Sequence, residues 1–377
     1  MFAIKGLCYA VVRVGSLQGC GRQLQALSLL SRTFSNSSSP TAHSEKPLKE
    51  WTLAVSPFTK VKCNLLCDIF VRPLDPHSFP EANRAFITVH GTNADQGLKL
   101  DNFYVHYEDQ SNELHIVAEE VNSDVIVELT APIKSDLLIM TRGPGNVNIK
   151  KMESDVCRVQ TETGHCVLQS VKSHKVEVQT SGGNVTGLGT IHGNVDISTS
   201  GDSNVNIKKI QGTTMNVSTD QGQLKVKAIY AESTSVSSSS GNIHLGHVHG
   251  EASVKSETGD VTVDSSSGAL KVSTNSGLID AYIGQDGTAD LLAQQGNVKI
   301  RVPSSMKGRV HLFGKSVEIS SEIPLQEAER HSTNERTTVR ARVNGGSDED
   351  CWIKATAETG TISLRTQSWF EALRLGS

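Results

Sequence analysis

The feature that most constrains this chain is a glycine that returns at a short, nearly fixed interval. From Gly241 to Gly296, seven glycines are spaced by 9, 9, 9, 9, 10 and 9 residues, and Gly145, Gly164 and Gly183 are spaced by 19. A period this short is typical of stacked units, none of which can bury its apolar face alone.

Each of these glycines opens the same short phrase. An apolar residue stands two positions after each glycine, and in nearly all cases a polar and then a second apolar residue follow, as in Val261, Thr262 and Val263 after Gly259; Val167 and Gly187 are the exceptions. Alternation with a period of two indicates a strand with one buried face, so we expect Val261 inside and Thr262 outside. The glycine provides the crowded or positive-φ backbone of a sharp corner. The apolar residue at the second position follows thirteen glycines: Gly145, Gly164, Gly183, Gly193, Gly222, Gly241, Gly250, Gly259, Gly268, Gly277, Gly287, Gly296 and Gly360.

The repeat predicts an all-β fold. We expect a β-solenoid of about 19-residue coils, with two short strands per coil and the coils stacked at a spacing of about 4.8 Å. The composition agrees, because aromatic residues are only 5% of the chain and glycines number 32. A β-propeller is disfavoured, since its blades repeat at roughly 40–50 residues.

The pattern also predicts how the chain is divided. Between Val61 and Val71 the alternation indicates one long strand whose inner face carries Cys63 and Cys67, and we expect this region to cover the exposed edge of the first coil. The expected segments are a transit peptide at 1–34, a flexible linker at 35–50, an N-terminal β cap at 51–136, solenoid repeats at 137–320, a charged loop at 321–350, and a closing strand with a short tail at 351–377.

The N-terminal segment has the composition of a targeting sequence. It carries Lys5, Arg13, Arg22 and Arg32, and the first acidic residue is Glu45. A basic, acid-free, serine-containing start is typical of mitochondrial transit peptides, and we expect a mitochondrial, matrix protein. The alternative is a cytosolic protein with a disordered tail. No run of 18 apolar residues occurs, so we expect no transmembrane segment.

The stretch "VIVELTAPIKSDLLIMTRGPGNVNI", Val125 to Ile149, and the recurring "SGxVxV" phrases resemble the adhesin-like β-solenoid domain family. The resemblance covers roughly residues 60–365 and implies the solenoid fold. It implies no catalytic residue, because the shared motifs are structural.

Two groups of possible metal ligands stand out. His244, His247 and His249 in "HLGHVHG" are weak candidates for zinc or copper, and the alternative is a solvated face beside the inward Ile243, Leu245 and Val248. Cys63 and Cys67 have the spacing of a zinc pair, but no matching second pair follows. We therefore interpret these two cysteines as core thiols, and we expect no cofactor.

The residues favour a non-enzymatic binding or scaffold protein with a protein or a glycan-like ligand. The charged loop and the outer sheets are the candidate contact surface. The formal net charge of -4 argues against nucleic acid as a partner. The alternative is a carbohydrate-type hydrolase or lyase, because the repeat carries carboxylates such as Asp280. Asp280 falls between Thr262 and Lys299 at coil spacing, which a cross-strand pairing also explains. The oligomeric state stays open.

Overall fold

The computed structural model describes residues 47–91, 103–118, 125–333, 335–346 and 351–367. Two units are distinguished, Met1–Ser44 and Glu45–Ser377, and all described residues belong to the second. The expected transit peptide, almost all of the expected linker and the tail after residue 367 therefore lie outside them. Every regular element in these ranges is a β-strand, which confirms the all-β prediction. They contain no helix long and apolar enough to cross a membrane.

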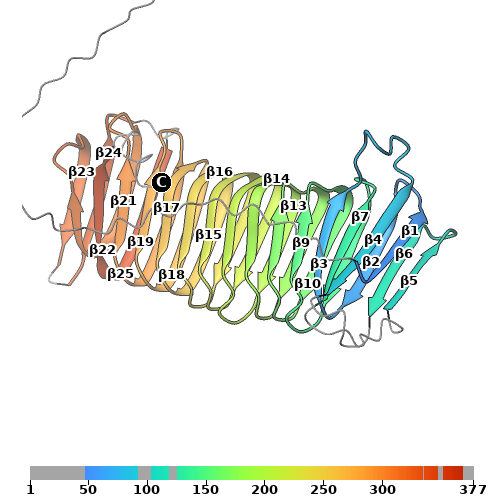
Figure 1. Ribbon diagram of the computed structural model, residues 1–377. Helices are drawn as coiled ribbons and strands as arrows, with labels where there is room; N and C mark the ends of the chain where they lie inside the picture. The colour runs from blue at the N-terminus through green and yellow to red at the C-terminus, as the bar shows by residue number, and fades with distance from the viewer. Residues whose placement is uncertain (1–46, 92–102, 119–124, 334, 347–350, 368–377) are drawn as a thin grey trace, which may run out of the picture. The chain divides into compact units, whose positions relative to one another are not determined.

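The strands follow one another in a continuous stack (Figure 1). In chain order they are β1 (Lys49–Ala54), β2 (Lys60–Leu65), β3 (Asp68–Pro73), β4 (Arg84–Gly91), β5 (Phe103–Glu108), β6 (Glu113–Ala118), β7 (Val125–Ala131), β8 (Asp136–Thr141), β9 (Val147–Lys150), β10 (Glu153–Thr161), β11 (Cys166–Gln169), β12 (Lys172–Thr180), β13 (Val185–Thr199), β14 (Val205–Thr219), β15 (Leu224–Ser238), β16 (Ile243–Thr258), β17 (Val261–Ser267), β18 (Ala269–Ser276), β19 (Ile279–Ile283), β20 (Thr288–Gln295), β21 (Val298–Val302), β22 (Gly308–Ile319), β23 (Leu325–Ser332), β24 (Thr337–Val343) and β25 (Cys351–Thr366).

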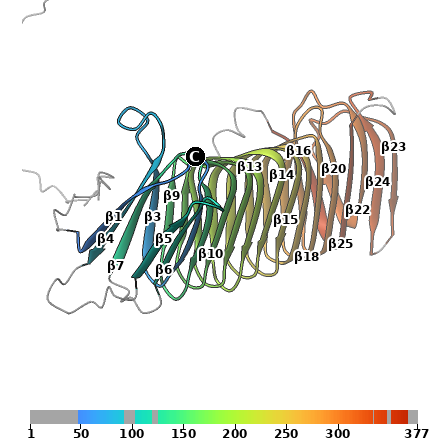
Figure 2. The same cartoon turned by 90° about the vertical axis from the view of Figure 1, so that its right-hand side faces the viewer.

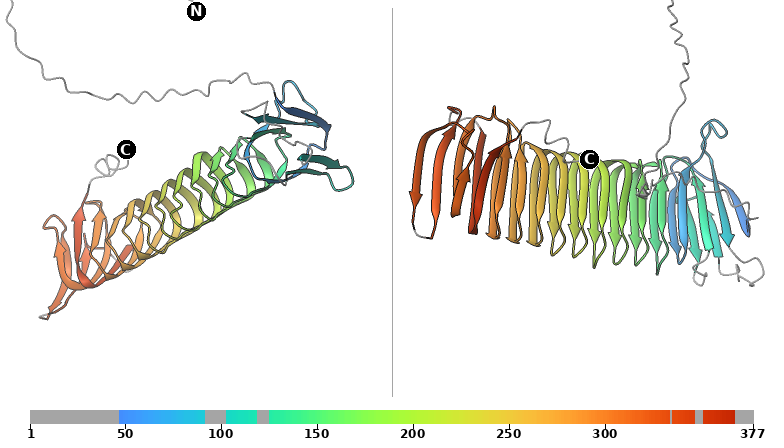
Figure 3. Two further views of the ribbon diagram at one scale, coloured as in Figure 1. Left: turned by 60° about the horizontal axis from the view of Figure 1, so that its bottom comes forward. Right: turned by 60° about the vertical axis from the view of Figure 1, so that its left-hand side comes forward.

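Neighbouring coils pair in parallel at the interval that the glycines predict. Cys166 lies opposite Val185, Val185 opposite Val205, and Val205 opposite Leu224, which are offsets of 19 or 20 residues. Figure 3 shows the resulting strands side by side from β9 to β18. Because each central coil both donates to and accepts from the coils on either side, its backbone is satisfied by the stack itself.

The pairings form two long rows. Row A is β1, β4, β7, β3, β9, β11, the first parts of β13 to β16, β17, β19, β21 and the last parts of β25 and β22. Row B is β5, β6, β2, β8, β10, β12, the last parts of β13 to β16, β18, β20, the first parts of β25 and β22, β24 and β23.

Coils in the middle of the stack have a third side. Ile191 lies opposite Ile210, Ile210 opposite Ile229, and Ile229 opposite Val248, and all four side chains are buried. The expectation of two strands per coil was therefore incomplete. The segment between two glycine phrases is more than a corner, because its central apolar residue joins the same core.

The corner glycines are required by the backbone of the preceding coil. A Cβ atom placed on Gly183 would lie 1.8 Å from the carbonyl oxygen of Gly164, and one on Gly164 would lie 1.9 Å from that of Gly145. None of these three glycines has a positive φ, so crowding alone excludes a side chain. Consecutive coils meet at this corner with less room than any Cβ atom needs.

A ladder of side chains follows the same corner, directly after the glycines. The side-chain oxygen of Asn146 accepts the backbone N–H of His165 at 2.8 Å, and that of Asn184 accepts the N–H of Asn204 at 2.8 Å. His165 contributes its ring Nδ1 to the N–H of Asn184 at 2.9 Å. Each of these bonds ties one coil to the next where the strands are interrupted. Asp260 continues the ladder toward Leu278.

The N-terminal strands correct one expectation. The alternation from Val61 to Val71 belongs to two strands, because β2 ends at Leu65 in row B and β3 begins at Asp68 in row A. The alternation passes unbroken through the corner because Cys67, within it, is also fully buried. Beyond β3, the pairs β4–β7, β1–β4 and β5–β6 are antiparallel, which Figure 2 shows at the blue end of the stack.

The structure also corrects the expectation of a charged loop at 321–350. Its described residues form the antiparallel hairpin of β23 and β24, and β24 buries Val339, Ala341 and Val343. The charged residues suggested a loop, but they lie on the outer side of β24 and on the exposed edge strand β23. The last strand, β25, lies between β20 and β21 on one side and β22 on the other.

Candidate functional site

A groove runs along the corner between the third side and row B. We call it the corner groove, and its volume is about 690 Å³. Its lining spans successive coils: Phe58, Lys134, Glu153, Ser154, Asp155, Lys172, Ser173, His174, His192, Gly193, Asn194, Gln211, Gly212 and Thr213.

The corner is hollow because its central residues are small. Ser154, Ser173, Gly193 and Gly212 occupy it in consecutive coils, and the hydroxyls of the two serines are 2.8 Å apart. A Cβ atom on Gly193 would lie 1.8 Å from the carbonyl oxygen of Ser173. The close approach of neighbouring coils thus requires glycine at this corner, and no large side chain fills the groove there.

One wall consists of long side chains, one from each consecutive coil. Glu153 lies opposite Lys172, Lys172 opposite His192, and His192 opposite Gln211. The Lys134 ammonium is 3.1 Å from the Glu153 carboxylate, and the Lys172 ammonium is 4.0 Å from it. The facing wall consists of Asp155, His174, Asn194 and Thr213. Two lysines and two carboxylates leave the groove balanced in formal charge.

Phe58 stands at the head of this wall. Lys60 lies opposite Asp136, which places Phe58 level with Lys134. The ring is 71% exposed, although its turn is firmly held. The Ser56 hydroxyl accepts the N–H of Phe58 at 3.2 Å, and the backbone N–H of Ser56 donates to the Tyr107 hydroxyl at 2.9 Å. An exposed aromatic ring in a polar groove can anchor a ligand.

A second concave region, the polar pocket, lies on the outer face of row A. Its volume is about 420 Å³, and its lining includes His244, Thr262, Asp264, Asp280 and Arg301. In the described part of the chain, Asp264 is the only acidic residue that is buried, with 7% of its surface exposed. Its carboxylate is 2.7 Å from Nε2 of His244. Burial of a carboxylate is costly, so this pair departs from the pattern of buried apolar and exposed polar residues in the other coils.

Local backbone geometry places Asp264. The pairing of β17 with β19 shifts register between Val263 and Ser266, as at a β-bulge. In the preceding coil Gly246 lies level with Asp264, and its missing side chain leaves room there. The burial of Asp264 was not predicted from the sequence, because the alternation places its side chain on the outer face. The glycine one coil earlier is the signal that could have indicated it.

Arg301 joins four successive coils at the polar pocket. Its guanidinium donates to the Asp280 carboxylate at 2.6 Å, to the Gln367 side-chain oxygen at 2.9 Å and to the Val263 carbonyl at 3.2 Å. Thr262, Asp280 and Lys299 do lie in one ladder, as the coil spacing predicted. The side chain that contacts the Asp280 carboxylate is nevertheless Arg301. Burial raises the pKa of the nearby Tyr282, and the charge of Arg301 acts in the opposite direction.

The three histidines of "HLGHVHG" have different surroundings. His244 contacts Asp264, whereas His249 stacks on Tyr230 with ring centroids 4.5 Å apart and makes a 2.7 Å hydrogen bond between its Nδ1 and the Ser267 hydroxyl. Ile243, Leu245 and Val248 are buried, as expected. Across the described residues, only one group brings three possible ligand atoms within 4.8 Å of one another, and it contains none of these histidines. The three imidazoles therefore do not converge.

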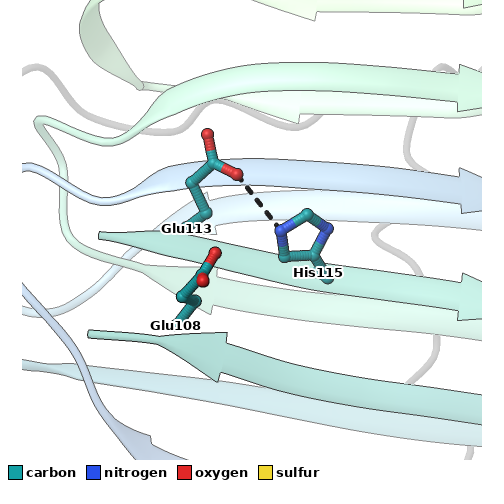
Figure 4. Close-up of side chains that lie close together, drawn as sticks. All are labelled: Glu108, Glu113 and His115. Carbon is teal, nitrogen blue, oxygen red and sulfur yellow. Dashed lines mark hydrogen bonds and ion pairs between the residues drawn. The ribbon is translucent and has the colours of Figure 1, made fainter. Parts of the chain in front are cut away.

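That other group is Glu108, Glu113 and His115, on β5 and β6 (Figure 4). The Glu113 carboxylate accepts a hydrogen bond from the Lys62 ammonium at 2.7 Å and lies 3.2 Å from Nε2 of His115. These two contacts hold the pKa of Glu113 below its usual range, with Lys62 the main cause. An ammonium already satisfies the central carboxylate, so we interpret the group as a cross-strand ion-pair cluster.

The core-thiol prediction for Cys63 and Cys67 is confirmed. Both lie in the hydrophobic core, with 3% and 0% of their surface exposed. Burial raises the pKa of Cys63 above its ordinary value and that of Cys67 to about 12.

Residues 188–365 match the model of the Toastrack DUF4097 family, whose fold is β-solenoid-like. Solved structures with similarity include a proposed adhesin from Parabacteroides merdae, at 14% identity and a TM-score of 0.35, covering 84% of this chain and 95% of that one. A proposed adhesin from Parabacteroides distasonis has 13% identity and a TM-score of 0.38, covering 84% and 96%. A proposed lipid-binding protein from the same species has 12% identity and a TM-score of 0.34, with the same coverage.

Proposed function

We propose that this chain is a non-catalytic binding protein whose ligand lies in the corner groove. The observation that carries the proposal is the continuity of the groove from Phe58 to Thr213, with polar side chains contributed by every coil. Five spacings of about 4.8 Å give the wall a length of roughly 24 Å. A site of this form suits an extended ligand that makes one small set of contacts per coil.

The rigidity of the coil stack supports the same function. The walls of the groove stand on strands that pair on both sides, so their spacing is fixed before any ligand arrives. A preorganised site loses less conformational entropy on binding than a mobile loop does. His174 and His192 present their rings to the groove from opposite walls.

A photo-crosslinking residue placed at His192 tests this proposal. In intact cells, illumination should give a discrete adduct with the groove variant. The same residue at Lys255, which is exposed on row B and outside the groove, should give none. The readout is the mass of the purified protein after illumination. Absence of an adduct at position 192, or equal adducts at both positions, would contradict a groove ligand.

The polar pocket supports a second candidate function, a carbohydrate-type hydrolase or lyase. A buried carboxylate that hydrogen-bonds to an imidazole is the arrangement that orients a general base, and Asp264 and His244 have it. Arg301 and Asp280 lie beside them. This candidate is distinguished from the first by new reducing ends or unsaturated ends when purified protein is incubated with soluble polysaccharides, and by their loss in His244→Gln.

We also propose import into mitochondria with removal of about the first 34 residues. Support comes from the basic, acid-free segment that ends in "RTFS", Arg32 to Ser35. N-terminal sequencing of the protein isolated from cells should find Ser35 or a residue close to it. A mature protein that still begins at Met1 would contradict this proposal.

A further inference from the structure

We propose that the ligand of the corner groove is a linear, neutral polysaccharide, and that Phe58 is the platform on which one sugar ring stacks. This inference rests on the proposed binding function and adds the chemical class of the ligand. Three properties of the groove lead to it: recognition through side chains alone, balanced charge, and one aromatic ring at the end of a polar wall.

The backbone of the coils that form the groove is already used. Away from the corner, β8, β10, β12, β13 and β14 pair in parallel on both sides, so the N–H and C=O groups of the strands point along the stack toward one another. At the corner itself the pairing shifts register, between Lys172 and Lys175 and between His192 and Val195. A peptide that binds by strand addition needs a free edge, and none of these strands offers one. The ligand therefore meets hydroxyl, amide, imidazole, ammonium and carboxylate groups, which suit the many hydroxyls of a sugar polymer.

The charges of the groove favour a neutral polymer. Glu153 lies between Lys134 and Lys172, so one of the two positive charges on this wall is compensated locally. Asp155 faces them from the other wall. An anionic polymer would place its charges beside two carboxylates, and a cationic polymer would place its charges beside two lysines. A chain of uncharged hydroxyl groups meets neither cost.

Phe58 provides the apolar contact that a sugar ring requires. Its ring is 71% exposed and stands level with Lys134 at the first coil of the groove. Tyr230, another ring near this side, is 41% exposed, lies outside the groove, and already contacts the Lys209 ammonium at 4.7 Å and the His249 ring at 4.5 Å. Phe58 is thus the aromatic residue of the groove itself, and the Ser56 hydroxyl accepts its backbone N–H.

The test is calorimetric titration of the purified chain with soluble mannan, dextran and cello-oligosaccharides, alongside a uronic-acid polymer and a neutral, flexible peptide. We expect at least one neutral glycan to bind, with little change in affinity between low and moderate salt. Phe58→Ala and His192→Ala should each weaken that binding at least ten-fold. Phe70→Ala removes an exposed ring from row A, outside the groove, and should leave the affinity unchanged.

Circular dichroism verifies that all three variants fold. The inference is overturned if none of the neutral glycans binds, if the uronic-acid polymer or the peptide binds more tightly, or if Phe58→Ala and Phe70→Ala have the same effect. In each of these cases a crosslinked adduct at position 192 still supports a groove ligand. Failure of the glycan class is therefore distinguishable from failure of the binding function.

Discussion

Gly183→Ala should destabilise the chain by about 3 kcal/mol, the upper part of the range for overpacking a rigid interior. The new Cβ atom would lie 1.8 Å from the carbonyl oxygen of Gly164 and 2.5 Å from its carbonyl carbon. Both atoms belong to the backbone of the neighbouring coil, so neither can move without breaking the pairing of two coils. The methyl group therefore separates the coils at this corner.

The adjacent Gly182 supplies the matched control. A Cβ atom there would meet nothing closer than the Thr163 side chain at 3.4 Å, and the residue has no positive φ. Gly182→Ala should change the free energy of unfolding by less than about 0.5 kcal/mol. The measurement is chemical denaturation of both variants, followed by circular dichroism. Similar midpoints for the two would mean that close stacking of coils does not require the glycine.

Val226→Asp should have a still larger effect, about 4 kcal/mol or more, or prevent folding altogether. Val226 is fully buried, and its neighbours across the coils are Ile207 and Leu245, which are also buried. The substitution loses apolar burial and places a carboxylate in the core without a partner. Domains are held folded by only about 5–15 kcal/mol, so such a loss is close to the whole stability.

Lys225→Asp is the control for this change. It introduces the same carboxylate one residue earlier, where the side chain is exposed on the outer face. The expected cost is below about 1 kcal/mol. Equal tolerance of the two substitutions, measured as yield of folded protein and as the unfolding midpoint, would remove the assignment of inner and outer faces along the coil.

The glycine phrase predicted the coil correctly because both of its parts, the glycine and the alternating residues after it, are strongly constrained by packing. Val261 is fully buried, as the alternation predicted, since a residue displaced by one position would point to the other face. Gly164 and Gly183 lie where backbones of adjacent coils nearly touch, and no other residue fits there. Repetition makes such local constraints visible in a single sequence.

Other features depend on contacts that alternation does not encode. The third side was missed because Ile191, Ile210 and Ile229 lie outside the glycine phrase. The corner ladder had a visible signal, since asparagine follows Gly145, Gly183, Gly241 and Gly296, but its meaning depends on the coil offset.

The candidate sites were even less predictable. The corner groove is lined by Phe58, Lys134 and His192, residues that are far apart in the chain. The groove itself arises from small residues, and small residues in a sequence do not show whether the space above them is open. The buried Asp264 depends on a register shift in β17, which leaves no mark in the spacing of the glycines.

The position of β25 sets the order in which this chain can fold. Coils from β8 to β21 can be added one after another as the polypeptide leaves the ribosome, because each pairs with the coil made before it. β22 cannot join them directly, since Ile353 of β25 lies between Ala289 of β20 and Val310 of β22. The end of the stack is therefore completed only once residue 366 has been synthesised, and until then the newest coil exposes an unpaired edge to the cell.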